Sequence, residues 1–515
     1  MNVGQLLTVT ARRFPDHPAI TYGQWTLTYA ELDRRTNALA HGLGAAGLVK
    51  GDRVGVLMRN RPELLEAMFA CFKAGYGLVP LNSRFTSEEV AFHVQDSGAA
   101  AVLTDGDGVP VVTGAGLDGV TVVAAGGRDL SGGVLDHEAV IEGGDPSPAV
   151  VGVDRDDLAW LFYTSGTTGR PKGAMLTHGN LGFVTASWLA DLTALDERDV
   201  TLHAAPLSHG AGFHAVAAIA RGAHQLLPTD TRFDPAAILD LLARARVTNT
   251  WLVPTQIVML IDTLAGARPE LPALRHVVYG GAPFAPADLR EALHLFGPVF
   301  VQLFRQGETP MTATVLSGRD HAAALAGDRP ERLASAGVAR PGTDVRILGD
   351  DDVELDPGQI GEVCVRGGAV MLGYWNRPEA TAETLRNGWL HTGDLGRMDE
   401  HGYVYLLDRA KDLIISGGSN VYAVEVEAAL ADHPDVYEVA VVGVADRTWG
   451  EIVTAVVVPR AGADADELPG RLSAHCATSL AGYKRPRRFV VRDSLPRNAY
   501  GKVLKRDLRE ELAGA

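Results

Sequence analysis

The sequence predicts an α/β protein with a large N-terminal domain of stacked α/β subdomains and a small, mobile α+β C-terminal domain. Apolar runs of strand length alternate with amphipathic helical stretches over most of the chain, and this texture changes after about residue 407. Strand–helix alternation is typical of parallel sheets that are covered by helices. A length of 515 residues leaves room for two or more domains.

The elements of the N-terminal part follow one another in this pattern. Residues 27–49 are amphipathic and close at glycine, which predicts a helix. Residues 52–58 (DRVGVLM) are a short apolar run and predict a buried strand, and residues 61–81 predict a helix and then a strand. The alternation recurs at 86–104 and 234–254, so we expect parallel sheets.

Two regions depart from that alternation. Residues 105–150 are rich in Gly, Asp and Val and predict an irregular or edge-strand excursion. Near the C-terminus, residues 425–432 and 467–480 predict helices, while VYEVAVVGVAD and IVTAVVVPR predict strands, which together make a compact α+β unit. We therefore divide the chain into an N-terminal domain, a charged hinge and a C-terminal domain, at 1–407, 408–412 and 413–515.

Composition excludes several classes of protein. Lys and Arg number 47 against 63 Asp and Glu, a net charge of −16, which argues against a general nucleic-acid binder. Cys71, Cys364 and Cys476 are far apart, so neither a zinc site nor a disulfide framework is indicated. The N-terminus has no apolar signal-peptide core, and no apolar run reaches the ~20 residues of a membrane span. We expect a cytoplasmic protein without a transmembrane segment.

The stretch YTSGTTGRPKG, residues 163–173, combines glycines, hydroxyl side chains and two basic residues. Glycines let the backbone approach a ligand closely, and N–H and hydroxyl groups can surround phosphate oxygens, with Lys172 adding a point charge. The stretch follows the apolar run LAWLFY, so it leaves a strand, where α/β folds bind ligands. It is not a Walker A loop, because Pro171 prevents a helix from starting there.

This stretch resembles the signature of the adenylate-forming superfamily, which comprises acyl-CoA synthetases, adenylation domains and beetle luciferases. The resemblance extends over essentially the whole chain. Its other motifs occur in order: PLSHGAG (206–212), YGGAP (279–283), GETP (307–310), HTGD (391–394), DRAKDLIISGGSNVYAVEVE (408–427) and NAYGKVLKRDL (498–508). The resemblance implies that a carboxylate reacts with ATP and Mg²⁺ to give acyl-AMP and pyrophosphate, and that the acyl group then passes to CoA.

The resemblance also implies roles for particular residues in nucleotide binding. Lys172 would stand beside the phosphates and Glu308 would bind Mg²⁺, since oxygen ligands suit this hard cation. Asp394 would accept hydrogen bonds from both ribose hydroxyls, Arg409 would contact ribose or phosphate, and Phe304 would stack on adenine. The loop around the β- and γ-phosphates would consist of Thr164, Ser165, Gly166, Thr167, Thr168 and Gly169. The adenine slot would be lined by Gly281, Ala282 and Pro283.

Lys172 and Glu308 are also predicted to be catalytic, and further motif residues would act in catalysis or in the domain movement. Lys502 matches the catalytic lysine of the family, whose charge would offset the charge that develops in the transition state. Lys411 matches the hinge about which the C-terminal domain rotates between the two half-reactions. Gly417 and Gly418 match the place where relatives admit the pantetheine arm of CoA.

Three histidines lie close to the acid-binding region. His209 is predicted as a catalytic and substrate-binding residue, because relatives place this position beside the acyl pocket, and a core histidine is the alternative. Gly280 is assigned to the same pocket. We expect His203 and His214 to be structural.

Arg305 is the main departure from the family pattern. Relatives keep glycine here, or a bulky Trp in members that take short acids, so Arg305 is expected to shorten the pocket and add positive charge. A buried arginine needs a partner, and a second anionic group on the substrate would serve. The alternative is that Arg305 pairs with a protein carboxylate. Ser419 and Ala423 also depart from the Glu and Pro that are common in relatives.

The function predicted from these features is a CoA ligase for a small or polar carboxylic acid. A different possibility is a relative that activates nitrite with ATP to diazotise an aromatic amine in natural-product biosynthesis. The same motifs are also compatible with a carrier-loading adenylation domain, a luciferase-like oxygenase or a non-catalytic nucleotide-binding scaffold.

Overall fold

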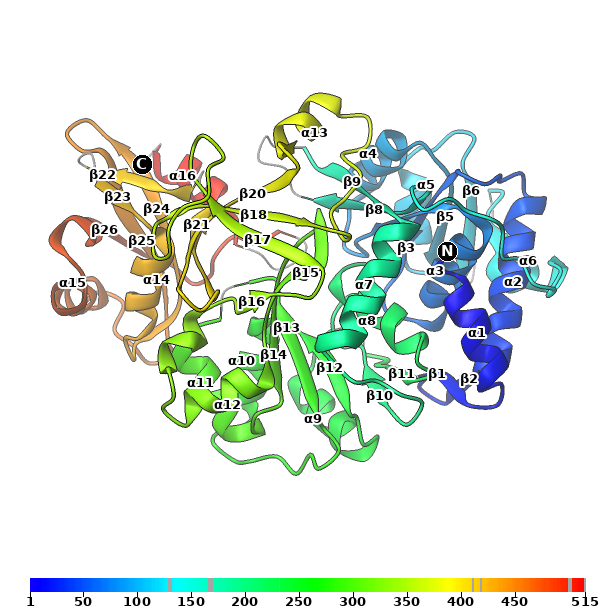
Figure 1. The fold of residues 1–515 in the computed structure, drawn as a ribbon, viewed down its shortest axis with the longest axis horizontal. Helices are drawn as coiled ribbons and strands as arrows, with labels where there is room; N and C mark the ends of the chain where they lie inside the picture. The colour runs from blue at the N-terminus through cyan, green and yellow to red at the C-terminus, as the bar shows by residue number, and fades with distance from the viewer. Residues whose placement is uncertain are drawn as a thin grey trace.

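The computed structural model has a mixed α/β architecture with a large N-terminal and a smaller C-terminal part, which confirms the predicted fold class (Figure 1). The mobility of the C-terminal part stays a prediction. The structure describes residues 1–127, 132–164, 170–230, 232–282, 284–409, 412–416, 419–498 and 503–513.

One sheet lies at the N-terminal end of the molecule and follows the order β7-β6-β5-β3-β4-β8-β9 (Figure 1). Its strands pair in parallel, apart from the antiparallel pair β8–β9. The strands are β3 (Arg53–Leu57), β4 (Gly77–Leu81), β5 (Ala99–Asp105), β6 (Thr121–Ala125), β7 (Leu135–Asp136), β8 (Leu158–Thr164) and β9 (Lys172–Thr177). The helices of this region are α2 (Tyr29–Ala45), α3 (Pro62–Ala74), α4 (Ser87–Ser97), α5 (Val109–Gly114) and α6 (His137–Gly143).

The expectation of an irregular excursion over 105–150 is wrong in part. The edge strand is present as β7, but α5, β6 and α6 are regular elements. The two helices have six and seven residues. Hydrophobic periodicity does not identify elements as short as these, because they complete at most two turns.

A second sheet follows the order β16-β15-β14-β13-β12-β10-β11-β1-β2. Its inner strands are parallel and its two ends are antiparallel. The strands are β1 (Pro18–Tyr22), β2 (Trp25–Thr28), β10 (Val200–Leu202), β11 (His224–Leu227), β12 (Asn249–Leu252), β13 (His276–Gly280), β14 (Phe300–Gln306), β15 (Thr309–Leu316) and β16 (Val338–Ala339). The helices are α1 (Gln5–Arg13), α7 (His178–Asp191), α8 (Gly210–Ile219), α9 (Pro235–Arg244), α10 (Pro254–Leu264), α11 (Pro286–Phe296) and α12 (Gly318–Leu325).

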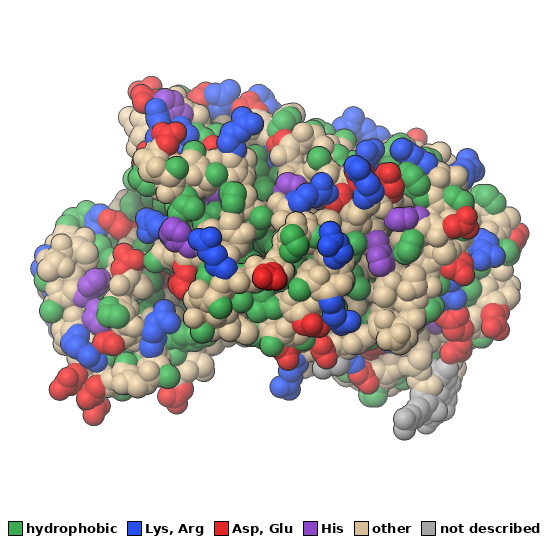
Figure 2. All heavy atoms as spheres, turned by 90° about the horizontal axis from the view of Figure 1, so that it is seen from below, with side chains coloured by type: hydrophobic (Ala, Val, Ile, Leu, Met, Phe, Trp, Pro, Cys, Tyr) green, Lys and Arg blue, Asp and Glu red, His purple; other side chains and the backbone are tan. Residues whose placement is uncertain are grey.

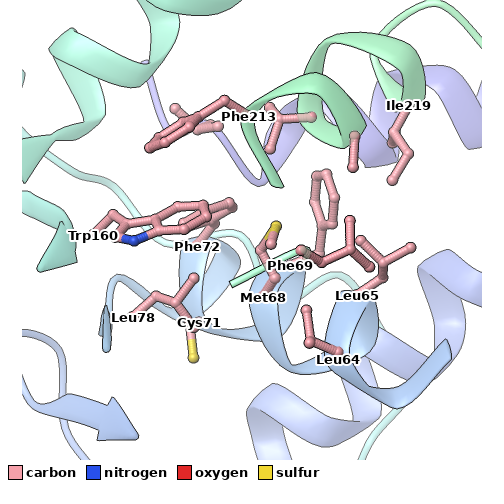
Figure 3. Packing of buried hydrophobic residues seen from close by; sticks show 14 of the residues in the cluster. Leu64, Leu65, Met68, Phe69, Cys71, Phe72, Leu78, Trp160, Phe213 and Ile219 are labelled. Carbon is pink, nitrogen blue, oxygen red and sulfur yellow. The ribbon is translucent and has the colours of Figure 1, made fainter. Parts of the chain in front are cut away.

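Helix α3 lies in the core between these two sheets. Every residue of α3 is buried, and a helix that is largely apolar on all sides is stable only when other elements cover it. Figure 3 shows Phe69 and Phe72 of α3 close to Phe213 of α8 and Trp160 of β8. Trp160 stacks on Phe213 with ring centroids 4.5 Å apart. The same hydrophobic cluster includes residues of β13 and β14, so it connects the two sheets.

The third and fourth sheets belong to the C-terminal half. The third has the order β17-β18-β20-β19, with β21 on β20, and the fourth the order β23-β22-β25-β24, with β26 on β25. The strands of the third sheet are β17 (Thr343–Leu348), β18 (Gly361–Gly367), β19 (Leu385–Arg386), β20 (Trp389–Met398) and β21 (Val404–Arg409), next to α13 (Pro378–Thr384). The fourth consists of β22 (Ile414–Ser416), β23 (Ser419–Val421), β24 (Val436–Asp446), β25 (Gly450–Pro459) and β26 (Arg488–Val491), with α14 (Ala423–Ala431), α15 (Leu468–Ser479) and α16 (Lys505–Ala513).

The change of sheet falls where the sequence places the hinge. Strand β21 still pairs with β20, whereas β22 pairs with β25. Residues of the fourth sheet and its helices form hydrophobic clusters of their own. Ala423, which stands where relatives have Pro, donates its N–H to Asp408 Oδ2 at 2.7 Å, a bond that proline could not make. We propose the boundaries 1–407, 408–412 and 413–515 on this basis.

The surface mixes charges of both signs. Figure 2 shows acidic, basic and hydrophobic side chains interspersed over one face of the molecule. All three cysteines are free and buried. Among the described residues, the helices are too short or too polar to cross a membrane.

Candidate active site

The predicted phosphate loop is framed by the pair β8–β9. Thr164, at the end of β8, pairs with Lys172, at the start of β9, so the two residues stand on either side of the loop. Residues 165–169, which include the predicted ligands Ser165 to Gly169, lie outside the described residues. The Lys172 ammonium lies over the ring of Tyr374, 5.0 Å from its centroid.

Glu308 lies at the tip of the β14–β15 hairpin and meets these residues. Its Oε1 accepts hydrogen bonds from Thr164 Oγ1 at 2.9 Å and from Tyr374 Oη at 2.7 Å. The hairpin approaches β8 closely, because a Cβ on Gly307 would lie 2.3 Å from Thr164 Cγ2. The structure therefore brings together Thr164, Lys172 and Glu308, which are far apart in sequence. Tyr374 joins them without having been identified in the sequence.

Asp394 lies on β20 and is contacted by the same hairpin. Gln306 Nε2 donates to Asp394 Oδ2 at 2.7 Å and to the carbonyl of Thr392 at 2.8 Å. The backbone of Asp394 pairs with that of Arg409 in β21, and the side chain of Arg409 is not among the described atoms. Gln306 was part of the motif segment, but sequence reasoning assigned it no role.

Glu362 binds the part of β20 that directly precedes Asp394. Its Oε2 lies 2.7 Å from His391 Nδ1, and its Oε1 accepts the N–H of Gly393 at 2.7 Å. Cys364 lies beside them, with Sγ 3.3 Å from His391 Nδ1. Burial raises the pKa of the Cys364 thiol, which favours its protonated form. We interpret this cluster as support for the HTGD segment of β20.

The predicted adenine slot begins at the end of β13. Gly280 pairs with Leu303 of β14, and a Cβ on Gly280 would lie 2.3 Å from the carbonyl oxygen of Leu303. Gly281 follows with φ +86°, a conformation that favours glycine. Ala282 comes next, and Pro283 is outside the described residues. Phe304 is 8% exposed and packs in a hydrophobic cluster, so stacking on a base stays a prediction.

His209 precedes α8 and lies near Arg305. Its ring packs edge-on against Phe162, with centroids 5.3 Å apart. Burial, and then the charge of Arg305, lower the pKa of His209 to about 3, so the ring is neutral at pH 7. His203 and His214 are fully buried, in agreement with a structural role. His203 Nε2 lies 2.8 Å from Gln225 Oε1, and His214 stacks on Trp188.

Arg305 points from the end of β14 into the space between Gly210 and Gly281. Its Nη2 lies 3.1 Å and 3.2 Å from the positions that a Cβ would take on these two glycines. The guanidinium carbon is 5.6 Å from the centroid of the Trp251 ring. Among the described residues, the expected alternative of an ion pair between Arg305 and a protein carboxylate is not observed.

Four predicted site residues besides the phosphate loop and Pro283 lie outside the described residues. They are Lys411, Gly417, Gly418 and Lys502. Their roles stay predictions. Ser419, next to Gly418, pairs with Ser416 in the β22–β23 hairpin.

The fold is that of an adenylate-forming enzyme. Residues 7–375 match the AMP-binding enzyme family, and residues 425–502 match the AMP-binding enzyme C-terminal domain. The chain belongs to this family.

Characterised relatives extend over the whole chain. The chain is similar to a feruloyl-CoA synthase of Amycolatopsis, with 42% identity over 504 residues that cover 97% of this chain and 96% of the relative. It is similar to ATP-bound MatB from Rhodopseudomonas palustris, at 34% identity and a TM-score of 0.88, with 100% and 99% of the two chains covered. It is also similar to o-succinylbenzoate CoA synthetase from Bacillus subtilis in complex with its acyl-adenylate, at 32% identity and a TM-score of 0.84, covering 98% and 97%.

Proposed function

We propose that the protein is an AMP-forming acyl- or aryl-CoA ligase for a small or polar carboxylic acid. The observation that carries this is the meeting of Thr164, Lys172 and Glu308 at the ends of β8, β9 and β14. Full-length similarity to a feruloyl-CoA synthase and to a CoA synthetase with a bound acyl-adenylate supports both half-reactions.

In the first half-reaction, a carboxylate oxygen of the acid bonds to the α-phosphorus of ATP and the bond to pyrophosphate breaks. The product is a mixed anhydride, which has AMP as a good leaving group. Lys172 and Thr164 flank the loop that would bind the β- and γ-phosphates. Lys502 would place its ammonium near the α-phosphate, where negative charge develops.

The hydrogen bonds around Glu308 are compatible with Mg²⁺ binding to its carboxylate. Thr164 and Tyr374 both donate to Oε1, and no described residue donates to Oε2, which leaves one carboxylate oxygen for a cation. A hard cation prefers oxygen ligands and would neutralise part of the phosphate charge. Glu308, held in place by Thr164 and Tyr374, would bind it.

In the second half-reaction, the sulfur of CoA bonds to the acyl carbon and AMP leaves. We propose that the C-terminal domain rotates about Lys411 between the two steps. The rotation would move Lys502 away and bring the segment with Gly417 and Gly418 to the site. Because of this rotation, variants of Lys502 should affect only the first half-reaction.

The proposal is tested by supplying ATP, Mg²⁺ and a panel of aliphatic and aromatic acids, with and without CoA. Pyrophosphate release and the acyl-CoA product are measured by a coupled assay and by mass spectrometry. We expect acid-dependent pyrophosphate release and a thioester only when CoA is present. Release without a thioester would point to a different acceptor, and no release with any acid would disprove ligase activity.

A further inference from the structure

The guanidinium of Arg305 lies in a space that two glycines leave open. Gly210 is the first residue of α8 and Gly281 directly follows β13. A Cβ at either position would come within 3.1 Å or 3.2 Å of Arg305 Nη2. Trp251 lies on another side, with the guanidinium carbon 5.6 Å from its ring centroid. The backbone around Arg305 thus accommodates a long cationic side chain beside the predicted acid pocket.

The charge of Arg305 is not matched by an acidic side chain in the described part of the chain. Its Nε is enclosed and has no hydrogen-bond partner. Glu308, three residues away, accepts from Thr164 and Tyr374, and Asp394 accepts from Gln306. Burial lowers the pKa of Arg305 to about 10, so the guanidinium stays charged at pH 7. Arg305 as a whole is half-buried, so the free-energy cost falls on the enclosed Nε, which an oxyanion would provide with a hydrogen-bond acceptor.

The surroundings of Arg305 add positive rather than negative potential. His209 is the residue before α8, and the N-terminus of this ten-residue helix carries a partial positive charge. The ring of His209 is neutral at pH 7 and offers no negative charge. An anion placed against Arg305 would therefore be stabilised by the guanidinium and by the helix terminus.

We propose that Arg305 is a specificity-determining residue that binds a planar oxyanion in the acid pocket. This inference rests on the proposed ligase function. The favoured source is a second carboxylate on the acid substrate, at the end away from the carboxylate that reacts with ATP. A guanidinium matches such a group because its N–H donors form two parallel hydrogen bonds to the two oxygens. A free anion of the same shape, such as nitrite, is the second source.

The test compares acids that differ only in this group. The pairs are terephthalate with 4-carbamoylbenzoate, and 4-carboxycinnamate with 4-carbamoylcinnamate, since a carboxamide has the shape of a carboxylate without its charge. For at least one pair, we expect kcat/KM of the wild-type enzyme to favour the dicarboxylate by roughly 10- to 100-fold. Arg305→Met, which keeps most of the bulk, should reduce this ratio to about 1, and Arg305→Lys should retain part of it.

Arg332→Met is the matched control. Arg332 also has an enclosed Nε without a hydrogen-bond partner, and its guanidinium lies 4.2 Å from the ring centroid of Tyr403. This variant should keep the wild-type ratio. A ratio that falls equally in both variants would show that loss of any such arginine disturbs the fold, and would overturn the assignment to Arg305.

Two further measurements distinguish the two sources of the anion, and they separate the proposed anion site from the proposed ligase function. Adding sodium nitrite to 4-aminobenzoate or 4-aminocinnamate tests whether the site binds a free anion. If pyrophosphate release requires nitrite and is lost in Arg305→Met, the site is assigned to the free anion. Turnover of the carboxamide acids with no dicarboxylate preference and no nitrite effect disproves the inference and leaves the ligase function intact. If no acid is turned over, calorimetric titration with terephthalate and with nitrite tests the anion site separately from the ligase function. Binding that disappears in Arg305→Met supports the anion site alone.

Discussion

Gln306 donates a hydrogen bond from Nε2 to Asp394 Oδ2 at 2.7 Å and thereby connects the β14–β15 hairpin to β20. A second bond from the same nitrogen to the Thr392 carbonyl, at 2.8 Å, fixes the direction of the amide. The amide thereby orients the carboxylate of Asp394. Gln306 is thus a positioning residue for the carboxylate that we propose binds ribose.

We predict that Gln306→Leu raises the KM for ATP by roughly 5- to 10-fold, since one such hydrogen bond contributes about 1 kcal/mol. The kcat should change less, because the amide acts through Asp394. Initial rates at varied ATP give both values. Asp394→Ala should raise the KM further, as it removes the carboxylate itself.

The control for this prediction is Gln359→Leu, in an exposed loop before β18. It should leave the KM for ATP unchanged. A Gln306→Leu variant with unaltered KM but a lower melting temperature would show that the Gln306–Asp394 bond serves the fold only.

A second prediction concerns Glu308. Glu308→Gln should require a higher Mg²⁺ concentration for half-maximal pyrophosphate release, because a neutral amide is a poorer ligand for a hard cation. Tyr374→Phe keeps the ring under Lys172 but removes the donor to Glu308 Oε1, so a smaller shift in the same direction is expected. Superimposable Mg²⁺ titrations for Glu308→Gln and the wild type would exclude Glu308 as the metal ligand.

The sequence was sufficient for elements with a strong local pattern. The run DRVGVLM forms β3, and the apolar stretch 61–81 forms α3 and β4. Both stretches are apolar enough to be buried irrespective of which elements pack against them. The resemblance to a family identified Thr164, Lys172 and Glu308 together. Spacing alone could not have shown that these three residues lie together, because β8 and β14 are more than a hundred residues apart in sequence.

The roles of Gln306, Glu362 and Tyr374 could not be predicted from the sequence. Each depends on a partner on another strand or loop: Asp394 for Gln306, His391 for Glu362 and Glu308 for Tyr374. A polar residue that orients a site residue has no periodicity and no spacing of its own. The absence of a carboxylate near Arg305 among the described residues likewise follows only from tertiary structure, because Glu308 is close to it in sequence but is hydrogen-bonded elsewhere.

A third prediction separates the two half-reactions. Lys502→Ala should slow acyl-AMP formation by at least about 100-fold, the scale of losing one aimed charge in a transition state. Transfer from supplied acyl-AMP to CoA should be nearly unchanged, because the lysine is expected to lie away from the site in that step. Single-turnover measurements of each step test this, and equal losses in both would contradict the proposed domain rotation.

The last prediction concerns stability at acid pH and the buried His203. Burial lowers the pKa of His203 from 6.5 to about 4, against a smaller opposing effect of its hydrogen bond to Gln225. Between these two values the unfolded chain binds a proton that the folded protein does not, so the free energy of unfolding should fall as pH decreases from about 6.5 to about 4. The slope is at most about 1.4 kcal/mol per pH unit for this residue. The free energy of unfolding is measured by urea denaturation at pH 6.5, 5.5 and 4.5, and it should decrease less steeply for His203→Gln than for the wild type. The control is His401→Gln, which changes a side chain that is 37% exposed and should follow the wild type. Equal slopes for all three proteins would mean that His203 takes up its proton without unfolding.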